Sequence, residues 1–275
     1  MNQIITKEVI SKEGHEKIVV QIPEKWDQNE RKLISTTTGE LFMPARLYFR
    51  FRNKKTLMKA LERRHCIELF DDGAFNISYW EEAQTIKLKV PYDEVPENVF
   101  PVLLARGSFV GQSEIHIDVR SFDRAIGVLK FLNKYIGSQF MYATHIATYN
   151  RLTSIKEQEE ENALNLDYDK IFDEEKLQQI EYEQDFSKFS NNENRDSEEV
   201  AQENFEEMIN RPIPVIRRTA IKNNQAVLNH LQFSLTIVQA FAKAYWDGKQ
   251  DYSMADLLCE LFQKNEAEEQ ETKDN

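Results

Sequence analysis

The chain has 275 residues, of which 41% are hydrophobic and 30% charged, and it carries a net charge of −12 at pH 7. This length suits one large domain or two ordinary ones. So strong a negative charge argues against a typical nucleic-acid-binding protein as a whole, and against binding to anionic membranes.

The sequence has no feature that predicts export or membrane insertion. Its first residues lack the apolar run of a secretory signal, and no stretch reaches the roughly 18 apolar residues of a membrane span. We therefore expect a soluble, cytoplasmic protein without membrane contact. Cys66 and Cys259 are far apart, which argues against a disulfide framework or a zinc motif. We expect both to be buried thiols, and we expect no cofactor.

The charge is distributed unevenly, and this suggests how the chain is divided. Residues 44–155 hold sixteen basic and twelve acidic side chains, whereas residues 156–210 hold five and nineteen. Such an acidic run with few apolar residues is typical of a tether. We expect an N-terminal hairpin extension (1–43), an α+β domain with a basic strand (44–155), an acidic, partly flexible linker (156–210), a helical docking element (211–264) and an acidic disordered tail (265–275).

The first elements in chain order are strands. Residues 18–22 suit a short strand, and residues 33–42 suit a hairpin around Gly39. In residues 46–52, Leu47, Phe49 and Phe51 alternate with polar side chains, which predicts a strand with one apolar and one cationic face. Asn53 then suits the N-cap of a helix.

The middle of the chain alternates in the same way. We expect strands at 66–70, 75–80, 85–90, 114–120 and 140–149, with an irregular proline-containing segment following residue 90. Ser121 suits the cap of a helix that ends at Gly137. The order of elements predicts an α+β fold with a mostly antiparallel sheet and two packed helices, related to the split-βαβ plan.

The longest helical pattern covers residues 217–247 and carries an apolar stripe. Ser253 and Asp256 have the spacing of a capping box for a short helix after it. The stripe either packs on the α+β domain or binds another protein or a second copy of the chain. The residues of this candidate interaction helix are Leu228, Leu231, Leu235, Val238 and Tyr245.

The basic strand is the first candidate site. Arginine binds phosphate through paired hydrogen bonds, and a tyrosine ring can stack on a base. An exposed sheet face of this kind would bind single-stranded RNA or DNA. The alternative is an ordinary solvated face, or arginines paired with Asp118, Glu68 and the acidic segment. The candidate nucleic-acid-binding residues are Arg46, Tyr48, Arg50, Arg52, Lys87, Lys89 and Arg120.

A weaker candidate is a metal site. Two histidines and one carboxylate can hold iron(II), and His116 and Asp118 would share a strand face, with His145 further along the chain. The alternative is a polar strand face on which Asp118 balances Arg120.

Three functions stay open at this point. The leading hypothesis is a non-enzymatic interaction or adaptor protein, because no catalytic motif is present. The second is nucleic-acid binding through the basic strand. The third is a metal-dependent enzyme that uses His116, Asp118 and His145.

Overall fold

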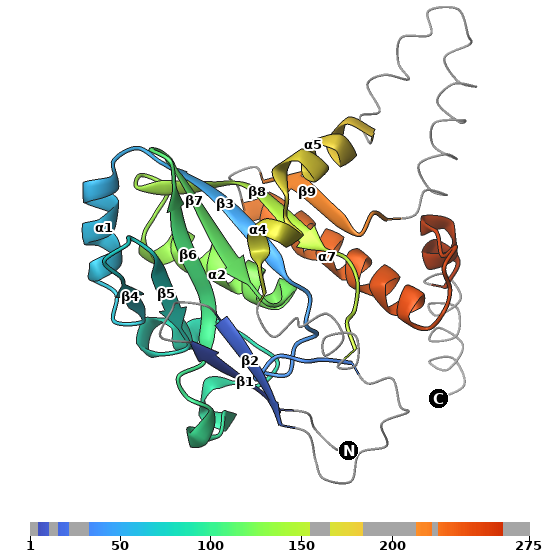
Figure 1. The fold of residues 1–275 in the computed structure, drawn as a ribbon, viewed down its shortest axis with the longest axis horizontal. Coiled ribbons are helices and arrows are strands. Elements are labelled where there is room, and N and C mark those ends of the chain that lie inside the picture. The colour runs from blue at the N-terminus through green and yellow to red at the C-terminus, as the bar shows by residue number, and fades with distance from the viewer. Residues whose placement is uncertain are drawn as a thin grey trace, which may run out of the picture.

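The fold is built around one antiparallel sheet, whose seven described strands follow the order β4-β5-β6-β7-β3-β8-β9 (Figure 1). The computed structural model describes residues 5–10, 16–21, 33–154, 166–183, 213–221 and 225–260. The strands of this sheet are β3 (Ala45–Phe51), β4 (Ile67–Leu69), β5 (Phe75–Ser78), β6 (Leu103–Val110), β7 (Glu114–Val119), β8 (Met141–Tyr149) and β9 (Ile216–Ala220). Together with the packed helices, this sheet confirms the expected α+β class.

The centre of the sheet is a split βαβ unit. Strand β3 lies between β7 and β8 and is antiparallel to both. Strands β7 and β8 therefore run parallel to each other, and α2 (Phe122–Tyr135) connects them. This is the relation to the split-βαβ plan that the order of elements suggested.

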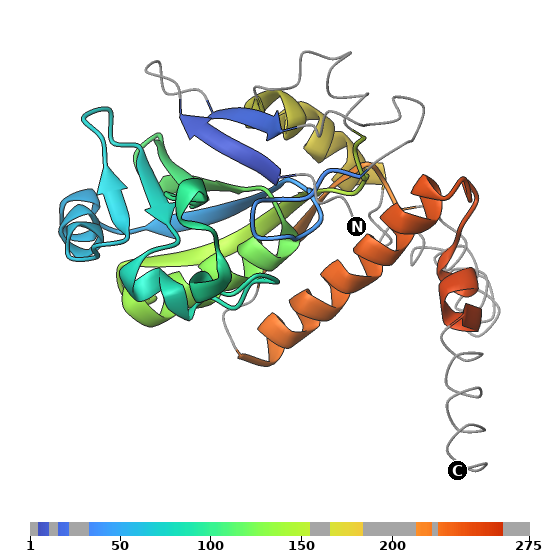
Figure 2. The same cartoon turned by 90° about the horizontal axis from the view of Figure 1, so that it is seen from below.

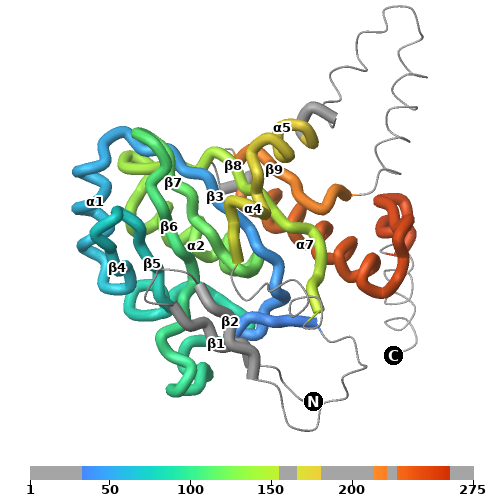
Figure 3. Tube along the Cα trace, viewed as in Figure 1, coloured from blue at the N-terminus to red at the C-terminus, as the bar shows by residue number. Residues whose placement is uncertain are grey.

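Helices cover both faces of the sheet. Helices α2 and α7 (Gln225–Trp246) lie on one face, and α4 (Tyr168–Ile171) and α5 (Glu174–Glu183) lie on the other (Figure 2). Helix α1 (Lys54–Glu62) packs beside β4, at the end of the sheet away from β9 (Figure 3). Residues 254–260 are also helical. Of the helices that the structure describes, none is both long and apolar enough to cross a membrane.

The remaining described elements are short. Strands β1 (Ile5–Ile10) and β2 (Glu16–Gln21) form a separate antiparallel pair. Three 3₁₀ helices lie between β5 and β6, namely η1 (Glu81–Thr85), η2 (Tyr92–Glu94) and η3 (Glu97–Val99).

Local signals in the sequence account for the central elements. Leu47 and Phe49 of β3 are fully buried against the α2 face of the sheet. Asn53 caps α1 by accepting a hydrogen bond from the Thr56 amide at 3.0 Å. Ser121 caps α2 in the same way, with the Arg124 amide at 3.1 Å. Such caps satisfy amide groups that the first helical turn leaves without partners.

Between β5 and α2, one expected strand is wrong and one strand was not predicted. Residues 85–90 are not a strand: Thr85 ends η1, and residues 86–90 form an irregular segment in which the Val90 amide donates to the Thr38 carbonyl at 2.9 Å. Their alternation arises because Ile86 faces the core while Lys87 and Lys89 are exposed. Strand β6, which follows the proline-containing segment, was not predicted from the sequence.

The long C-terminal helix begins later in the chain than the expected residue 217. Residues 216–220 form β9, which pairs with β8 and extends the sheet, and the helix begins at Gln225. Pairing satisfies the backbone groups of β8 that would otherwise be exposed at an edge. The sheet therefore crosses the expected boundary at residue 210.

Of the expected acidic linker, the structure describes residues 166–183, which form α4 and α5. The flexible part expected in that linker and the tail at 265–275 lie outside the described residues.

Candidate functional site

The basic strand does not present the continuous exposed face that its sequence predicts. Arg46 and Tyr48 are 4% and 3% exposed, because α4 and α5 cover this part of the sheet. Arg50 and Arg52, further along β3, are exposed. The expected face is therefore wrong for its first two members, and binding of nucleic acid by this face stays a prediction.

Arg46 is held by two carboxylates. Its Nε and Nη2 donate to Asp118 Oδ1 and Oδ2 at 2.7 and 3.0 Å, and its Nη1 donates to Asp169 Oδ1 of α4 at 2.7 Å. Burial opposes the charge of Arg46, but these hydrogen bonds outweigh it and raise the pKa of the guanidinium. The acidic segment therefore occupies the arginine that we expected to bind phosphate.

Tyr48 lies in an aromatic and charged environment on the same face. Its ring meets His116 edge-on at 4.7 Å and His145 at 6.5 Å between centroids. The guanidinium of Arg218 lies 5.6 Å from the centre of the Tyr48 ring and pairs with Glu174 at 2.6 Å. Burial, followed by the charge of Glu174, raises the pKa of the Tyr48 phenol.

The candidate metal ligands do not converge. His116 Nε2 lies 2.9 Å from Glu114 Oε1, whereas Asp118 bonds Arg46. Tyr48 lies opposite both His116 and His145 in the strand register, and so separates the two imidazoles. Among the residues that the structure describes, no group of three His, Cys, Asp or Glu side chains is placed to hold a metal ion. The predicted convergence of these three residues is wrong.

The other predicted basic residues do not extend the sheet face. Arg120 is 4% exposed at the end of β7. Lys87 and Lys89 are exposed on the irregular segment after η1 instead of on a neighbouring strand. The seven candidate nucleic-acid-binding residues therefore do not form one continuous surface.

The apolar stripe of the candidate interaction helix packs within the chain. Leu231, Leu235 and Val238 of α7 are buried in the main core, at 5–6% exposure. Leu228 is half-buried at the edge of this core, and Tyr245 is half-buried beside Phe241. Docking through α7 stays a prediction, but these side chains already have partners in the chain.

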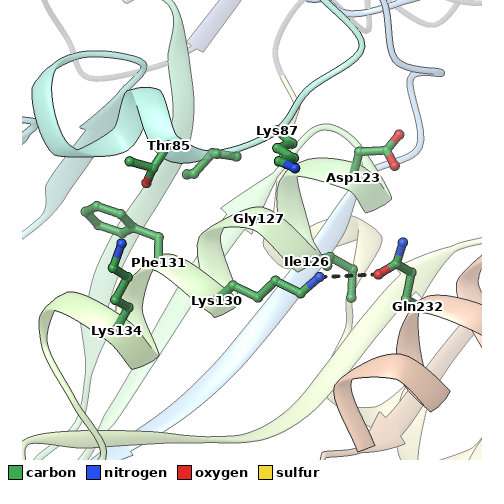
Figure 4. Close-up of a pocket in the computed structure, with 10 residues that line it drawn as sticks. Thr85, Lys87, Asp123, Ile126, Gly127, Lys130, Phe131, Lys134 and Gln232 are labelled. Atoms are coloured by element: carbon green, nitrogen blue, oxygen red, sulfur yellow. Dashed lines mark hydrogen bonds between the residues drawn. The ribbon is translucent and has the colours of Figure 1, made fainter. Parts of the chain in front are cut away.

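A cleft lies where α2, α7 and the segment after η1 meet, and Figure 4 shows it in close-up. Its volume is about 480 Å³, within the range of roughly 300–1,000 Å³ that is usual for small-molecule sites. The lining residues are Thr85, Ile86, Lys87, Asp123, Ile126, Gly127, Lys130, Phe131, Lys134 and Gln232.

Buried apolar side chains form the floor of the cleft. Ile86, Ile126 and Phe131 are 5%, 8% and 3% exposed. Gly127 of α2 allows Ile86 to approach closely, because a Cβ at this position would lie 2.4 Å from Ile86 Cγ2. The glycine thus fixes the distance between the 85–87 segment and α2.

The rim of the cleft is mainly cationic. Lys87, Lys130 and Lys134 are exposed around the floor, and Lys130 Nζ donates to Gln232 Oε1 of α7 at 3.3 Å (Figure 4). Asp123 is the one carboxylate in the lining. Partial desolvation, followed by the charge of Glu40, raises the pKa of Asp123, although the residue as a whole is exposed. Three ammonium groups around an apolar floor are suited to an organic anion.

Sequence reasoning missed most of this cleft. Lys130 and Lys134 are four residues apart and so share one side of α2, a signal that the sequence contained. The contribution of Gln232 could not be foreseen, because it depends on how α7 packs against α2.

The comparisons with known proteins give no further indication. No protein-family model matches the chain, and neither a curated protein nor a solved structure matches it.

Proposed function

We propose that this chain is a non-enzymatic binding protein that takes a small organic anion in the cleft between α2 and α7. The observation that supports this is the combination of an apolar floor with three exposed lysines on the rim. The apolar floor favours a planar or aliphatic body, and the ammonium groups favour a phosphate or carboxylate at its edge.

The charges of the rim define the kind of recognition. Lysine acts as a point charge on a flexible stem and imposes no fixed fork on its partner. Gln232 can donate its amide hydrogens to an anion while its carbonyl oxygen accepts from Lys130. The ligand class is therefore selected by charge and by an apolar body, with little constraint on the geometry of the anionic group.

Phenyl phosphate is a suitable probe because it combines an aromatic ring with a dianion. At roughly 0.3 kcal/mol for each of its about eleven non-hydrogen atoms, it should bind the full chain with a Kd on the order of 1–10 mM. Amide NMR shifts would measure the Kd and locate binding at Ile86 and Gly127. Phenol and inorganic phosphate should each bind more weakly.

Two variants that lose the same positive charge distinguish binding in the cleft from non-specific electrostatic attraction of the anion to the protein. The double variant Lys130→Gln/Lys134→Gln should weaken phenyl phosphate binding by roughly threefold or more, from the loss of two partly screened charges. The control is Lys176→Gln/Lys243→Gln, which removes two exposed lysines that do not line the cleft. The proposal fails if both variants weaken binding equally, or if the shifts map elsewhere.

A further inference from the structure

A second cationic surface lies at the other end of the sheet, on and beside α1. Six exposed basic side chains gather there in a chain whose net charge is −12. We call this the α1 basic surface, and it consists of Arg50, Arg52, Lys54, Lys55, Lys59 and Arg63. Glu62 is the one acidic residue of α1.

Three of these cations form a row along the helix. Lys55, Lys59 and Arg63 are spaced four residues apart, so they follow one side of α1 at steps of about 6 Å. Leu57 and Leu61 are fully buried on the inward side, which fixes the row towards solvent.

The structure describes the ion pairing of this row with residues 33–154, 166–183, 213–221 and 225–260. Within the part of the chain that the structure describes, Lys55, Lys59 and Arg63 form no salt bridge. Moreover, Lys54 and Lys55 stand in the first turn of α1, which has no acidic residue, and the helix dipole disfavours cations there. The positive charges of this first turn therefore oppose the stability of α1, although Lys54 Nζ also lies 4.5 Å from the centre of the Phe109 ring. An external anion would relieve this unfavourable interaction with the dipole.

We infer that the α1 basic surface binds the phosphate backbone of nucleic acid without reading its bases. Contacts of this kind need only a row of Lys and Arg, and they account for most non-specific affinity. An amphipathic helix that binds membranes inserts an apolar face, whereas the apolar side of α1 is buried in the core. Protein interfaces are centred on buried aromatic or apolar side chains, and α1 exposes no large hydrophobic residue.

The test is fluorescence anisotropy of the full chain with a labelled DNA duplex and a labelled single strand, at several salt concentrations. If about five phosphates are contacted, duplex affinity should fall on the order of 10²- to 10³-fold between 50 and 200 mM salt. The variant Lys55→Gln/Lys59→Gln/Arg63→Gln should weaken binding roughly tenfold or more at low salt and reduce the salt slope by about three.

A variant of equal net charge is the control. Lys170→Gln/Lys176→Gln/Lys243→Gln removes three exposed lysines from α4, α5 and α7, and it should leave binding within about twofold of the parent chain. Circular dichroism should show that both triple variants keep the parent fold. Phenyl phosphate titrations should be unchanged by the α1 variant, which separates this surface from the cleft.

Three results would overturn the inference. The first is no binding to either nucleic acid at 20 mM salt. The second is an equal loss of binding in the two triple variants. The third is binding to phosphatidylserine vesicles, but not to nucleic acid, that the α1 variant abolishes, since this would assign the surface to a membrane instead.

Discussion

Arg46 and Asp118 form a two-fold hydrogen-bonded ion pair between β3 and β7, with distances of 2.7 and 3.0 Å. Their side chains are 5% and 16% exposed. Removing one partner of such a pair leaves a charge in a poorly hydrated place, which typically costs 3–5 kcal/mol. We therefore expect Asp118→Asn to lower the free energy of unfolding by about 3 kcal/mol, as measured by urea denaturation.

A double variant distinguishes burial of charge from loss of packing. Arg46→Met/Asp118→Leu removes both charges and retains most of the side-chain volume. It should be less destabilising than Asp118→Asn, because no uncompensated charge stays behind. If the double variant loses as much free energy of unfolding as Arg46→Met and Asp118→Leu lose together as single variants, this account is contradicted.

Asp169 gives a contrasting expectation, because it bonds the same guanidinium from a solvated position. Its side chain is 87% exposed, although its distance to Arg46 Nη1 is also 2.7 Å. Exposed ion pairs contribute about 0–1 kcal/mol. Asp169→Asn should thus lower the free energy of unfolding by less than about 1 kcal/mol, and 500 mM salt should remove most of the difference. A cost equal to that of Asp118→Asn would show that α4 shields this pair from water.

Asp118 and Asp169 also show which features of this site the sequence could not predict. The alternation of Leu47 and Phe49 with Arg46 and Tyr48 correctly predicts strand β3 and its buried face. The state of the opposite face depends on Asp169, which lies 123 residues further along the chain. Periodicity reports which side of a strand is apolar, but not which distant segment covers the polar side.

The helix α2 was predictable because its signals are local, whereas the cleft beside it was not. Ser121 and Gly137 mark the ends of α2 in the sequence itself. The cleft requires three separate segments, and one of them, after η1, resembles a strand in sequence while adopting irregular backbone. In that segment Ile86 is buried by packing against α2, so the sequence alternates although the backbone pairs with no described strand.

Gly127 provides a test of that packing. An alanine Cβ at this position would lie 2.4 Å from Ile86 Cγ2, so the 85–87 segment must shift. Overpacking costs about 1–3 kcal/mol, while alanine gains about 1 kcal/mol over glycine within a helix. Gly127→Ala should therefore destabilise the protein by up to about 2 kcal/mol in thermal or urea unfolding, and it should weaken phenyl phosphate binding.

The sign of this effect should reverse when Ile86 is shortened. In an Ile86→Ala background the clashing methyl group is absent, so Gly127→Ala should stabilise by up to about 1 kcal/mol through helix propensity alone. An equal effect of Gly127→Ala in both backgrounds would show that Ile86 does not limit this position.

The two cysteines should differ sharply in reactivity, although the sequence suggested that both are buried. Cys66 is buried, whereas Cys259 is exposed. Burial, followed by hydrogen bonding to Glu82, raises the pKa of the Cys66 thiol to about 12. Because the thiolate is the reactive form, an aromatic disulfide reagent at pH 8 should modify Cys259 rapidly, and Cys66 only when the chain unfolds. Cys259→Ser should abolish the rapid phase, and Cys66→Ser should retain it.

Since the unfolded thiol ionises near pH 8.5, the stability that protonated Cys66 contributes is complete below that pH. This stabilisation declines as the pH rises towards 12. Rapid reaction of both thiols at pH 8 would contradict the burial of Cys66.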